Sequence, residues 1–293
     1  MGPLDVVQLT ALMERTSGRR EISIGLIDGP VLLAQPYLAS QNIQEIPGKL
    51  RGTCASAESA ACLHGTLVAG MLVARRGSAA PAICPECTLL LRPIFPETGE
   101  TKGDMPSATP EELAGAIVDC VTAGARLLNL SAALAQPSSK GVRELEQALD
   151  YAGARGAIAV AAAGNQGTIG SSVITRHPSV IPVAACNLQG RPLSQSNLGG
   201  SIGKRGLMAP GEGVTSLGTN GKPQSFGGTS AAAPFVTGAI ALLWSEFPNA
   251  SPAEVKLAVT RCRRAVRNSV VPPVLDAEAA YEMMASARRR KAS

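Results

Sequence analysis

The stretch FGGTSAAAPFVTGAIALLW, residues 226–244, sets one serine, Ser230, at the start of a long apolar run. Gly227 and Gly228 allow a sharp turn before it, and Pro234 is expected near the first helical turn, where a missing N–H is tolerated. The pattern predicts a buried helix that begins at Ser230. Backbone N–H groups and the dipole of a helix N-terminus favour negative charge, so this position suits a reactive serine. A capping serine on an ordinary buried helix is the alternative.

Short apolar runs alternate with helical patterns over the rest of the chain. Helices are predicted at residues 64–74, 109–124 and 141–156, the second of them opened by the cap Thr109 and by Pro110. Strands apolar on both faces, separated by helices, are typical of a parallel sheet covered on both sides. The predicted strands are ISIGLI (22–27), TLLLRPIF (88–95), RLLNLSAAL (126–134), AIAVAAAG (157–164), SVIPVAAC (179–186) and GLMAPG (206–211).

We therefore expect a protein of the α/β class, with a three-layer α/β/α fold and a mostly parallel central sheet. The sequence contains no internal repeat and no long linker, which predicts a single domain over residues 1–287 and a basic tail over 288–293. The segment VLDAEAAYEMMASA, residues 274–287, is expected to form a last strand end and a closing helix of that domain.

The composition argues against several kinds of partner. The chain of 293 residues is 45% hydrophobic and 17% charged, enough to bury a substantial core, and its net charge of +5 is modest. Basic residues are scattered except in the tail, so no nucleic-acid surface is predicted. Every apolar stretch is interrupted before it reaches membrane-spanning length, and the N-terminus lacks a secretory signal. We therefore expect no membrane contact and a cytoplasmic location.

Seven cysteines leave their pairing open. Cys54 and Cys62 flank a short polar loop, and Cys84 and Cys87 form CPEC. The residues are compatible with four free thiols in a reducing compartment or with two local disulfides, each closing a small loop. A zinc site is disfavoured, because only one C-x-x-C pair is present and no His-x-x-x-His follows it. The other three lie in apolar patterns and are expected in the core: Cys120, Cys186 and Cys262.

In parallel α/β folds, chemistry gathers where the carboxyl ends of strands meet helix N-termini. Three residues stand at such places: Asp28 directly after the first strand, His64 at the start of a helix, and Ser230. Each alone is a weak signal, because such an Asp is often a turn residue and such a His is often a cap. A serine hydroxyl needs a nearby base to become a nucleophile. Of the two histidines, His177 precedes a proline at the mouth of a strand, which favours a loop role.

Five motifs in the same order resemble those of the subtilisin-like serine proteases, over most of the chain. They are HGTLVAG (64–70), NLSAAL (129–134), AAAGNQG (161–167), LMAPGEGVTS (207–216) and GTSAAAPFVTGAIALL (228–243). The chain order Asp, His, Ser is that of subtilisin, whereas an α/β-hydrolase would show G-x-S-x-G with Asp and His after the serine. A nucleotide-binding enzyme would need a phosphate loop after the first strand, and DGPV is not one. The aspartate motif departs from the family, which usually has Ser or Thr after the Asp.

The resemblance implies a catalytic triad of Asp28, His64 and Ser230. It also implies that the Asn165 side-chain amide, together with Ser230, stabilises the oxyanion of the tetrahedral intermediate. A turn residue is the alternative for Asn165, because Gly-Asn sequences tolerate left-handed geometry. The residues expected to line the substrate cleft come from NLSAAL and AAAGN: Asn129, Leu130, Ser131, Ala132, Ala162, Ala163 and Gly164.

A narrower resemblance involves LIDGPV (26–31), CLHGTLVAG (62–70) and SAAPAICPECTLLLRPIF (78–95), which are similar to segments of the N-terminal proteases of cyanobactin biosynthesis. Those proteases remove the leader from a ribosomal precursor peptide, so the implied partner is such a peptide. RRGSAAPAICPECT stands where many family members bind calcium. It holds one acidic residue, Glu86, so we expect no calcium there and no cofactor.

Two other functions compete with leader removal. One is a general degradative protease of the same family. The other is an inactive homologue that serves as a peptide-binding module. Such a homologue would be expected to have lost a triad residue, and none is lost in this sequence.

Overall fold

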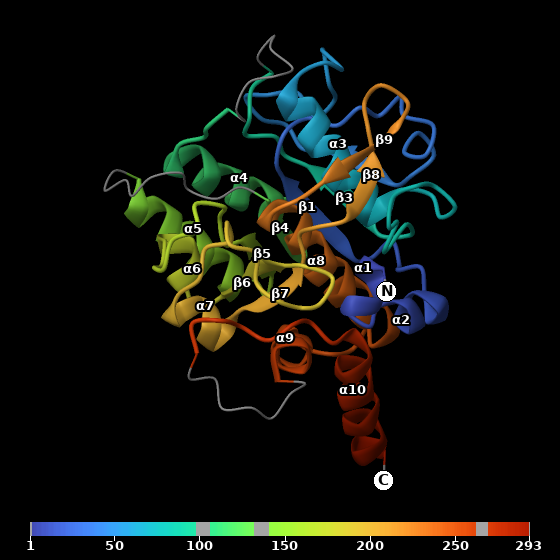
Figure 1. Cartoon of the computed structure of the whole chain (residues 1–293), viewed down its shortest axis with the longest axis vertical. Coiled ribbons are helices and arrows are strands. Elements are labelled where there is room, and N and C mark those ends of the chain that lie inside the picture. The colour runs from blue at the N-terminus through green and yellow to red at the C-terminus, as the bar shows by residue number, and fades with distance from the viewer. Residues whose placement is uncertain (1, 98–105, 132–140, 262–268, 293) are drawn as a thin grey trace.

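The computed structural model describes residues 2–97, 106–131, 141–261 and 269–292. At its centre is a seven-stranded sheet in the order β2-β3-β1-β4-β5-β6-β7, in which every neighbouring pair is parallel (Figure 1). Its strands are β1 (Ser23–Ile27), β2 (Ile43–Glu45), β3 (Thr88–Leu91), β4 (Leu127–Leu130), β5 (Ile158–Ala162), β6 (Val180–Cys186) and β7 (Leu207–Pro210). The predicted parallel sheet is confirmed.

The described residues form ten α-helices and a separate antiparallel ribbon of β8 (Val214–Leu217) with β9 (Pro223–Phe226). The helices are α1 (Pro3–Val6), α2 (Thr10–Arg15), α3 (Ala60–Val73), α4 (Pro110–Thr122), α5 (Val142–Ala154), α6 (Val173–Arg176), α7 (Gly200–Arg205), α8 (Thr229–Glu246), α9 (Pro252–Arg261) and α10 (Ala277–Ala292). None of the helices formed by the described residues is long and apolar enough to cross a membrane.

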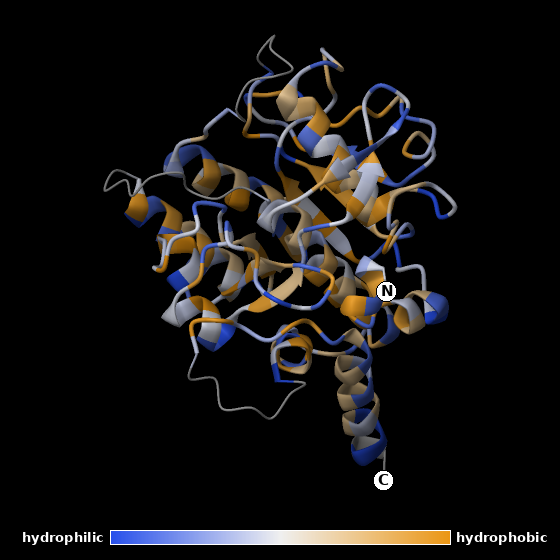
Figure 2. Cartoon of the chain, in the orientation of Figure 1, coloured by the Kyte–Doolittle hydropathy of each residue, from blue (hydrophilic) through white to orange (hydrophobic). Residues whose placement is uncertain are grey.

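Helices cover both faces of the sheet. Successive residues of a strand point to opposite faces, and β5 illustrates the consequence. Ile158 and Val160 belong to the apolar cluster that includes α3 and α8, whereas Ala159 and Ala161 belong to the one that includes α4 and α5. The sheet therefore separates two cores, which confirms the predicted three-layer α/β/α fold and explains why its strands are apolar on both faces (Figures 1 and 2).

Helix α8 runs through the larger of the two cores. Within residues 229–245 every residue is buried except Ser230, so the helix is surrounded by protein along nearly its whole length. Neighbours approach it closely: a Cβ on Gly238 would lie 2.5 Å from Cγ2 of Ile83. The small residues of this stretch therefore serve tight packing, and the rigid helix fixes Ser230 at its exposed end.

The start of α4 agrees with the sequence prediction. Thr109 is its N-cap, and Pro110 is its first residue. The Thr109 hydroxyl accepts a hydrogen bond from the Glu112 amide at 3.2 Å, and the Glu112 carboxylate accepts one from the Thr109 amide at 2.9 Å. This reciprocal capping box satisfies two otherwise unpaired N–H groups, so the helix begins at the predicted cap, Thr109.

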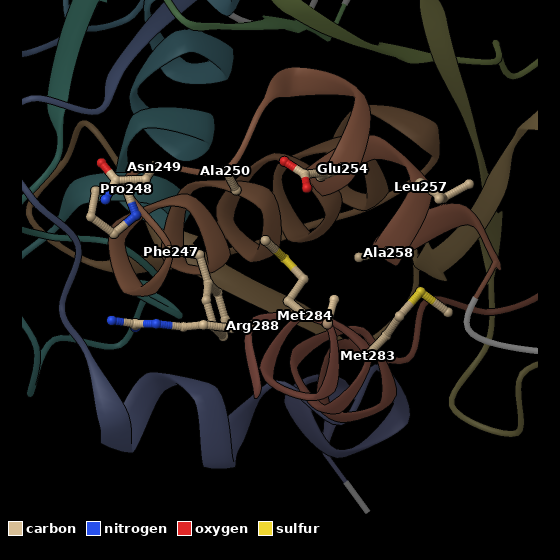
Figure 3. A pocket seen from close by; sticks show the side chains of 11 residues that line it. Phe247, Pro248, Asn249, Ala250, Glu254, Leu257, Ala258, Met283, Met284 and Arg288 are labelled. Atoms are coloured by element: carbon tan, nitrogen blue, oxygen red, sulfur yellow. The ribbon is translucent and has the colours of Figure 1, made fainter. Parts of the chain in front are cut away.

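The C-terminal part differs from its prediction in one respect. The basic residues 288–290, expected in a tail, continue α10, whose end is strongly hydrophilic (Figure 2). Together with α9 and the loop after α8, this helix encloses an apolar hollow of about 330 Å³, into which Phe247, Leu257, Met283 and Met284 contribute side chains (Figure 3). The hollow lies at the opposite end of α8 from Ser230, about 27 Å away for an 18-residue helix.

Candidate active site

Residues that follow the carboxyl ends of β1, β4 and β5 meet at one edge of the sheet, because these strands are parallel neighbours. Asp28 follows β1, Ser131 follows β4, and Asn165 lies shortly after β5. Helix α3 carries His64, and α8 carries Ser230 in its first turn. The fold thus brings together five polar residues that are distant in the sequence.

His64 and Asp28 form a close pair, in which Asp28 is buried and His64 is partly exposed. His64 Nδ1 lies 2.6 Å from Asp28 Oδ1, and the Asp28 side chain has no exposure to solvent. Burial by itself lowers the pKa of the imidazole, but the charge of Asp28 and its hydrogen bond outweigh burial, so the His64 pKa is raised from its ordinary value of 6.5. Because the carboxylate holds the proton on Nδ1, Nε2 of the neutral ring is available as a base.

Gly29 explains the unusual aspartate motif. Its amide donates to Asp28 Oδ1 at 2.6 Å, but it has no hydroxyl to offer, and the buried Asp28 Oδ2 has no hydrogen-bond partner among the described residues. A larger residue has no room, because a Cβ at position 29 would lie 2.0 Å from the Ala61 carbonyl oxygen of α3. The helix that carries His64 therefore packs directly on the backbone of the aspartate turn.

This packing predicts that Gly29→Ala is destabilising and reduces activity. The added methyl must push α3 away from the turn, which costs roughly 1–3 kcal/mol in an overpacked core and moves His64 away from Asp28. Gly115→Ala in α4 is the matched control, because nothing lies within 4 Å of its Cβ and Ala is the better helix former. Urea unfolding of both variants measures the difference, and equal midpoints would contradict the proposed clash.

Ser230 is held where α8 begins. Gly228 precedes the helix with φ of 74°, and a Cβ there would lie 2.8 Å from Asn165 Oδ1. Both the positive φ and the close approach of Asn165 require glycine at this position. The Ser230 hydroxyl donates to the Ser131 carbonyl at 2.8 Å rather than to His64. Hydrogen bonds between catalytic groups are often completed only when substrate is bound. As a first-turn residue, Ser230 also has an amide N–H without an intrahelical acceptor.

Pro234 lies deeper in α8 than the sequence suggests, since it is inside the helix rather than in its first turn. Its missing N–H leaves the Ser230 carbonyl without the usual partner four residues on. The Ser131 hydroxyl points at that carbonyl across 3.5 Å. Ser131 in turn accepts a hydrogen bond from the Asn129 amide at 2.7 Å. Because Thr237 donates to Asn129 Oδ1 at 2.8 Å, a buried polar chain joins β4 to the serine helix.

Asn165 is oriented by Thr229, the neighbour of Ser230. Asn165 Oδ1 accepts from the Thr229 amide at 2.9 Å and from its hydroxyl at 3.0 Å. The Gly164 amide donates to the same hydroxyl at 3.1 Å. With its oxygen occupied in this way, the exposed Asn165 presents its NH₂ group as a donor beside Ser230. A negatively charged oxygen bound there would meet that amide and the Ser230 N–H together.

The sequence profile of the subtilase family matches residues 19–273. The chain belongs to the subtilase family. As a member of this family of serine peptidases, it is a hydrolase that acts on peptide bonds. Subtilisin DY from Bacillus licheniformis is 33% identical over 198 residues, which are 66% of this chain and 67% of that protein. Several other curated subtilisins are matched over 48% of their length.

Two solved structures resemble this subtilase over almost their whole length. The prenylagaramide maturation protease PagA is 27% identical with a TM-score of 0.80, and the match covers 94% of this chain and 98% of that one. The patellamide maturation protease PatA is 27% identical with a TM-score of 0.75, covering 92% and 98%. Both belong to cyanobactin maturation, in agreement with the narrower resemblance found in the sequence.

Burial corrects part of the predicted substrate cleft of this subtilase. The Asn129 and Leu130 side chains are fully buried and β4 is paired on both sides, so neither side chain reaches a substrate. Ala162 and Ala163 are also almost fully buried. Gly164 is buried as well, and its amide and carbonyl are hydrogen-bonded within the protein. Ser131 keeps its carbonyl facing Ser230, and Ala132 lies outside the described residues.

Of the two cysteine pairs, one forms a disulfide and the other consists of free thiols. Cys54 and Cys62 form a disulfide that ties the preceding loop to α3, close to His64. Cys84 and Cys87 are free and buried, so no disulfide joins this pair. Cys120 and Cys186 are buried as predicted, and Cys262 lies outside the described residues.

Donor atoms of a kind that binds metals gather at one place among the described residues, formed by Cys54, Cys62 and Glu97. The disulfide removes both thiolates, however, and the Glu97 carboxylate accepts hydrogen bonds from the Ala55 and Ser56 amides, each at 2.8 Å. The residues therefore form a brace in front of α3 and do not have the donor chemistry of a metal site.

Two contributors to the site were missed at the sequence level. Phe226, at the end of β9, packs edge-on against the His64 ring, with ring centroids 5.3 Å apart. Thr229 orients Asn165, as described above. Both stand inside the opening stretch, but their neighbours come from residues far away in the sequence. His177, by contrast, stays outside the site, where its Nδ1 lies 2.7 Å from Ser179 Oγ.

Proposed function

We propose that this subtilase is a serine endopeptidase that removes the leader from a ribosomal precursor peptide. The observation that carries the proposal is the likeness over nearly the full length of both chains to the maturation proteases PagA and PatA. The curated subtilisins are matched over a smaller share of the chain. The residues of the site supply the chemistry of peptide hydrolysis, and the maturation proteases supply the class of substrate.

Each residue has a defined part in the proposed reaction. Ser230 Oγ attacks the scissile carbonyl while His64 Nε2 takes its proton, and Asp28 stabilises the imidazolium that forms. The Asn165 NH₂ group and the Ser230 N–H donate to the oxyanion. His64 then gives its proton to the leaving amine, and water hydrolyses the acyl-enzyme on Ser230 by the same steps in reverse.

Substrate selectivity is assigned to an extended recognition sequence near the end of β4. Strand β4 is hydrogen-bonded to β1 and β5 through Leu130, so an added strand has free backbone groups to pair with only beyond that residue. The Ser131 carbonyl stands at this point, next to Ser230. A peptide bound here would place its main chain directly in front of the nucleophile.

A competition experiment tests the proposed substrate class. Unfolded casein and a leader-bearing precursor peptide are offered at equal concentrations, and products are followed by mass spectrometry. We expect a single cut between leader and core, with casein degraded slowly. Rapid cleavage of casein at many sites would support the general degradative protease instead, and binding of both peptides without any cleavage would support the inactive binding module.

The raised pKa of His64 predicts the pH dependence of the reaction. His64 must be neutral to act as the base. The acidic limb of the kcat/KM profile should therefore have its midpoint above pH 6.5, and at lower pH kcat/KM should fall about tenfold per pH unit. In Asp28→Asn the charge that raises the His64 pKa is lost, so the limb should move to lower pH and kcat should fall by roughly 10⁴. Coinciding limbs in the two pH profiles would contradict this origin of the shift.

The stability of the folded protein should decrease as pH rises, whereas kcat/KM increases. Because the folded-state pKa of His64 is raised, protonation is favoured by folding, and the His64–Asp28 pair contributes its full stability below the unfolded value of about 6.5. That contribution is lost as pH rises through the folded pKa. Urea unfolding of the wild type and of Asp28→Asn at pH 6 and pH 9 measures it as a pH-dependent difference between the two proteins.

A further inference from the structure

A second polar site lies at the other edge of the sheet. Arg126 directly precedes β4, so it stands at the strand end opposite to Ser131. Beside it is a cavity of about 280 Å³, whose lining residues also include Arg155, Pro252 and Trp244. None of the residues that line the cavity is acidic. The cavity therefore presents two positive charges and no compensating negative one.

Arg126 is a half-buried cation without a counter-ion. Its guanidinium carbon lies 3.9 Å above the Trp244 ring, which is itself completely buried. Among the described residues, its guanidinium makes no ion pair and no hydrogen bond. Burial lowers the pKa of Arg126, and no neighbouring carboxylate raises it again. Removing a cation from water without a counter-ion is unfavourable. An anion bound beside Arg126 would therefore be stabilised.

Arg155, whose side chain is exposed, also lines the cavity. Its guanidinium carbon lies 4.9 Å from the centre of the Tyr151 ring, and within the described part of the chain its guanidinium has no carboxylate partner. Among the described residues, ion pairs with a carboxylate are seen for two other arginines: Arg92 with Asp119 at 2.9 Å and Arg176 with Glu146 at 3.3 Å. What distinguishes Arg126 and Arg155 is that both line one cavity that has no acidic residue among its lining residues.

We propose that this cavity binds a phosphate group, either free phosphate or that of a small phosphomonoester. A guanidinium offers planar pairs of N–H donors that match phosphate oxygens, and stacking on an aromatic ring holds it in one orientation. Two such groups around one cavity supply charge and geometry for a dianion. Its remaining walls are small or apolar, which leaves room for a short organic group beside the phosphate.

The site is separate from the catalytic residues. Trp244 and Ser230 lie near opposite ends of α8, 14 residues apart, so about 21 Å of helix separates them. A phosphate in the cavity therefore does not compete with peptide substrate for Ser230. The inference is also independent of the proposed function, because it concerns other residues and another ligand.

Trp244 supplies a built-in reporter, because it is the single tryptophan of the chain. The full-length protein is titrated with inorganic phosphate and, in a second arm, with glycerol 3-phosphate. Sodium chloride keeps the ionic strength constant. We expect a saturable change in Trp244 fluorescence and a melting temperature that rises with ligand concentration. Saturation by one ligand and not the other would identify the source of the phosphate group.

Variants separate this site from general charge effects. Arg155→Gln leaves the ring under Arg126 untouched, and it should weaken phosphate binding at least tenfold; Arg126→Gln should do the same. Arg75→Gln is the matched control, because Arg75 also stacks on an aromatic ring, that of Tyr37 at 5.4 Å, but lies outside the cavity. All three variants should keep the proteolytic activity of the wild type, which shows that they are folded.

Two results would overturn the proposal. One is a response to both ligands that does not saturate or that equal ionic strength of chloride reproduces. The other is saturable binding that persists unchanged in Arg126→Gln and Arg155→Gln.

Discussion

Ser230→Ala is expected to abolish covalent labelling by a fluorophosphonate probe and to lower kcat/KM on peptide substrates by a factor on the order of 10⁶. The probe forms a bond to an activated serine oxygen, and alanine removes that oxygen. The substitution leaves the backbone of α8 unchanged, so the protein should fold normally. In-gel fluorescence of the labelled protein and a peptide cleavage assay measure the two effects.

Ser225→Ala is the matched control for this variant. Ser225 is an exposed serine on β9, five residues before Ser230, so a probe that labelled serines indiscriminately would react with both. Labelling should remain in Ser225→Ala and disappear in His64→Ala, which keeps the hydroxyl but removes its base. Labelling that persists in Ser230→Ala would contradict the assignment of the nucleophile.

Asn165→Ala is expected to lower kcat by a factor of roughly 100 to 1,000 while KM changes little. The hydrogen bond from the Asn165 NH₂ group strengthens when negative charge develops on the substrate oxygen, so its loss is felt mainly in the transition state. Steady-state kinetics on a peptide substrate separate the two constants. An unchanged kcat would mean that Asn165 is only a turn residue.

The structural role of Asn165 needs a control of its own. Its Oδ1 also accepts two hydrogen bonds from Thr229, so alanine removes a brace as well as a donor. Asn165→Asp keeps an acceptor for Thr229 but replaces the NH₂ donor by a second oxygen. If the donor is what matters, Asn165→Asp should lose kcat as severely as Asn165→Ala while its unfolding midpoint stays closer to that of the wild type.

The sheet was largely predictable because buried parallel strands are apolar along their whole length. The predicted strand at 157–164 became β5, and the one at 179–186 became β6. The segment TLLLRPIF was predicted too long, since β3 ends at Leu91 and the Arg92 side chain pairs with Asp119 of α4. Arginine can interrupt a strand or continue it, and only its distant partner decides which.

The elements that sequence reasoning missed are short and partly exposed. Strand β2 and the ribbon of β8 and β9 have mixed burial patterns and no sustained apolar run. They form because neighbouring segments hold them in place: β2 along the edge of β3, and β8 against α3, where Ser216 donates to the Leu67 carbonyl at 2.6 Å. Such elements have little local signal, because their stability comes from tertiary contacts.

Burial excludes several of the side chains that the sequence predicts in the substrate cleft. NLSAAL includes Ser131, whose carbonyl accepts a hydrogen bond from Ser230, but a motif does not say which side chains of a strand point into a core. Asn129 is completely buried and bonds to Ser131 and Thr237, so its role is internal support. A polar residue in an apolar strand signals either a ligand contact or a buried network, and the spacing of residues cannot distinguish them.

The sequence by itself determined the class of fold, the buried helix that carries Ser230 in its first turn, and the order of Asp28, His64 and Ser230 along the chain. These properties depend on local composition and on motifs that are contiguous in sequence. Only the tertiary structure decided that Cys54 pairs with Cys62 while Cys84 and Cys87 stay free.

The tertiary structure also decided the finer chemistry of the site. Position 29 is glycine because α3 places the Ala61 carbonyl 2.0 Å from where a Cβ would be, which leaves Asp28 Oδ2 without a partner among the described residues. The Ser131 hydroxyl faces the Ser230 carbonyl that Pro234 cannot bond. The physical reason is common to these cases: each depends on separations of a few ångströms between residues from different elements, and sequence distance carries no information about them.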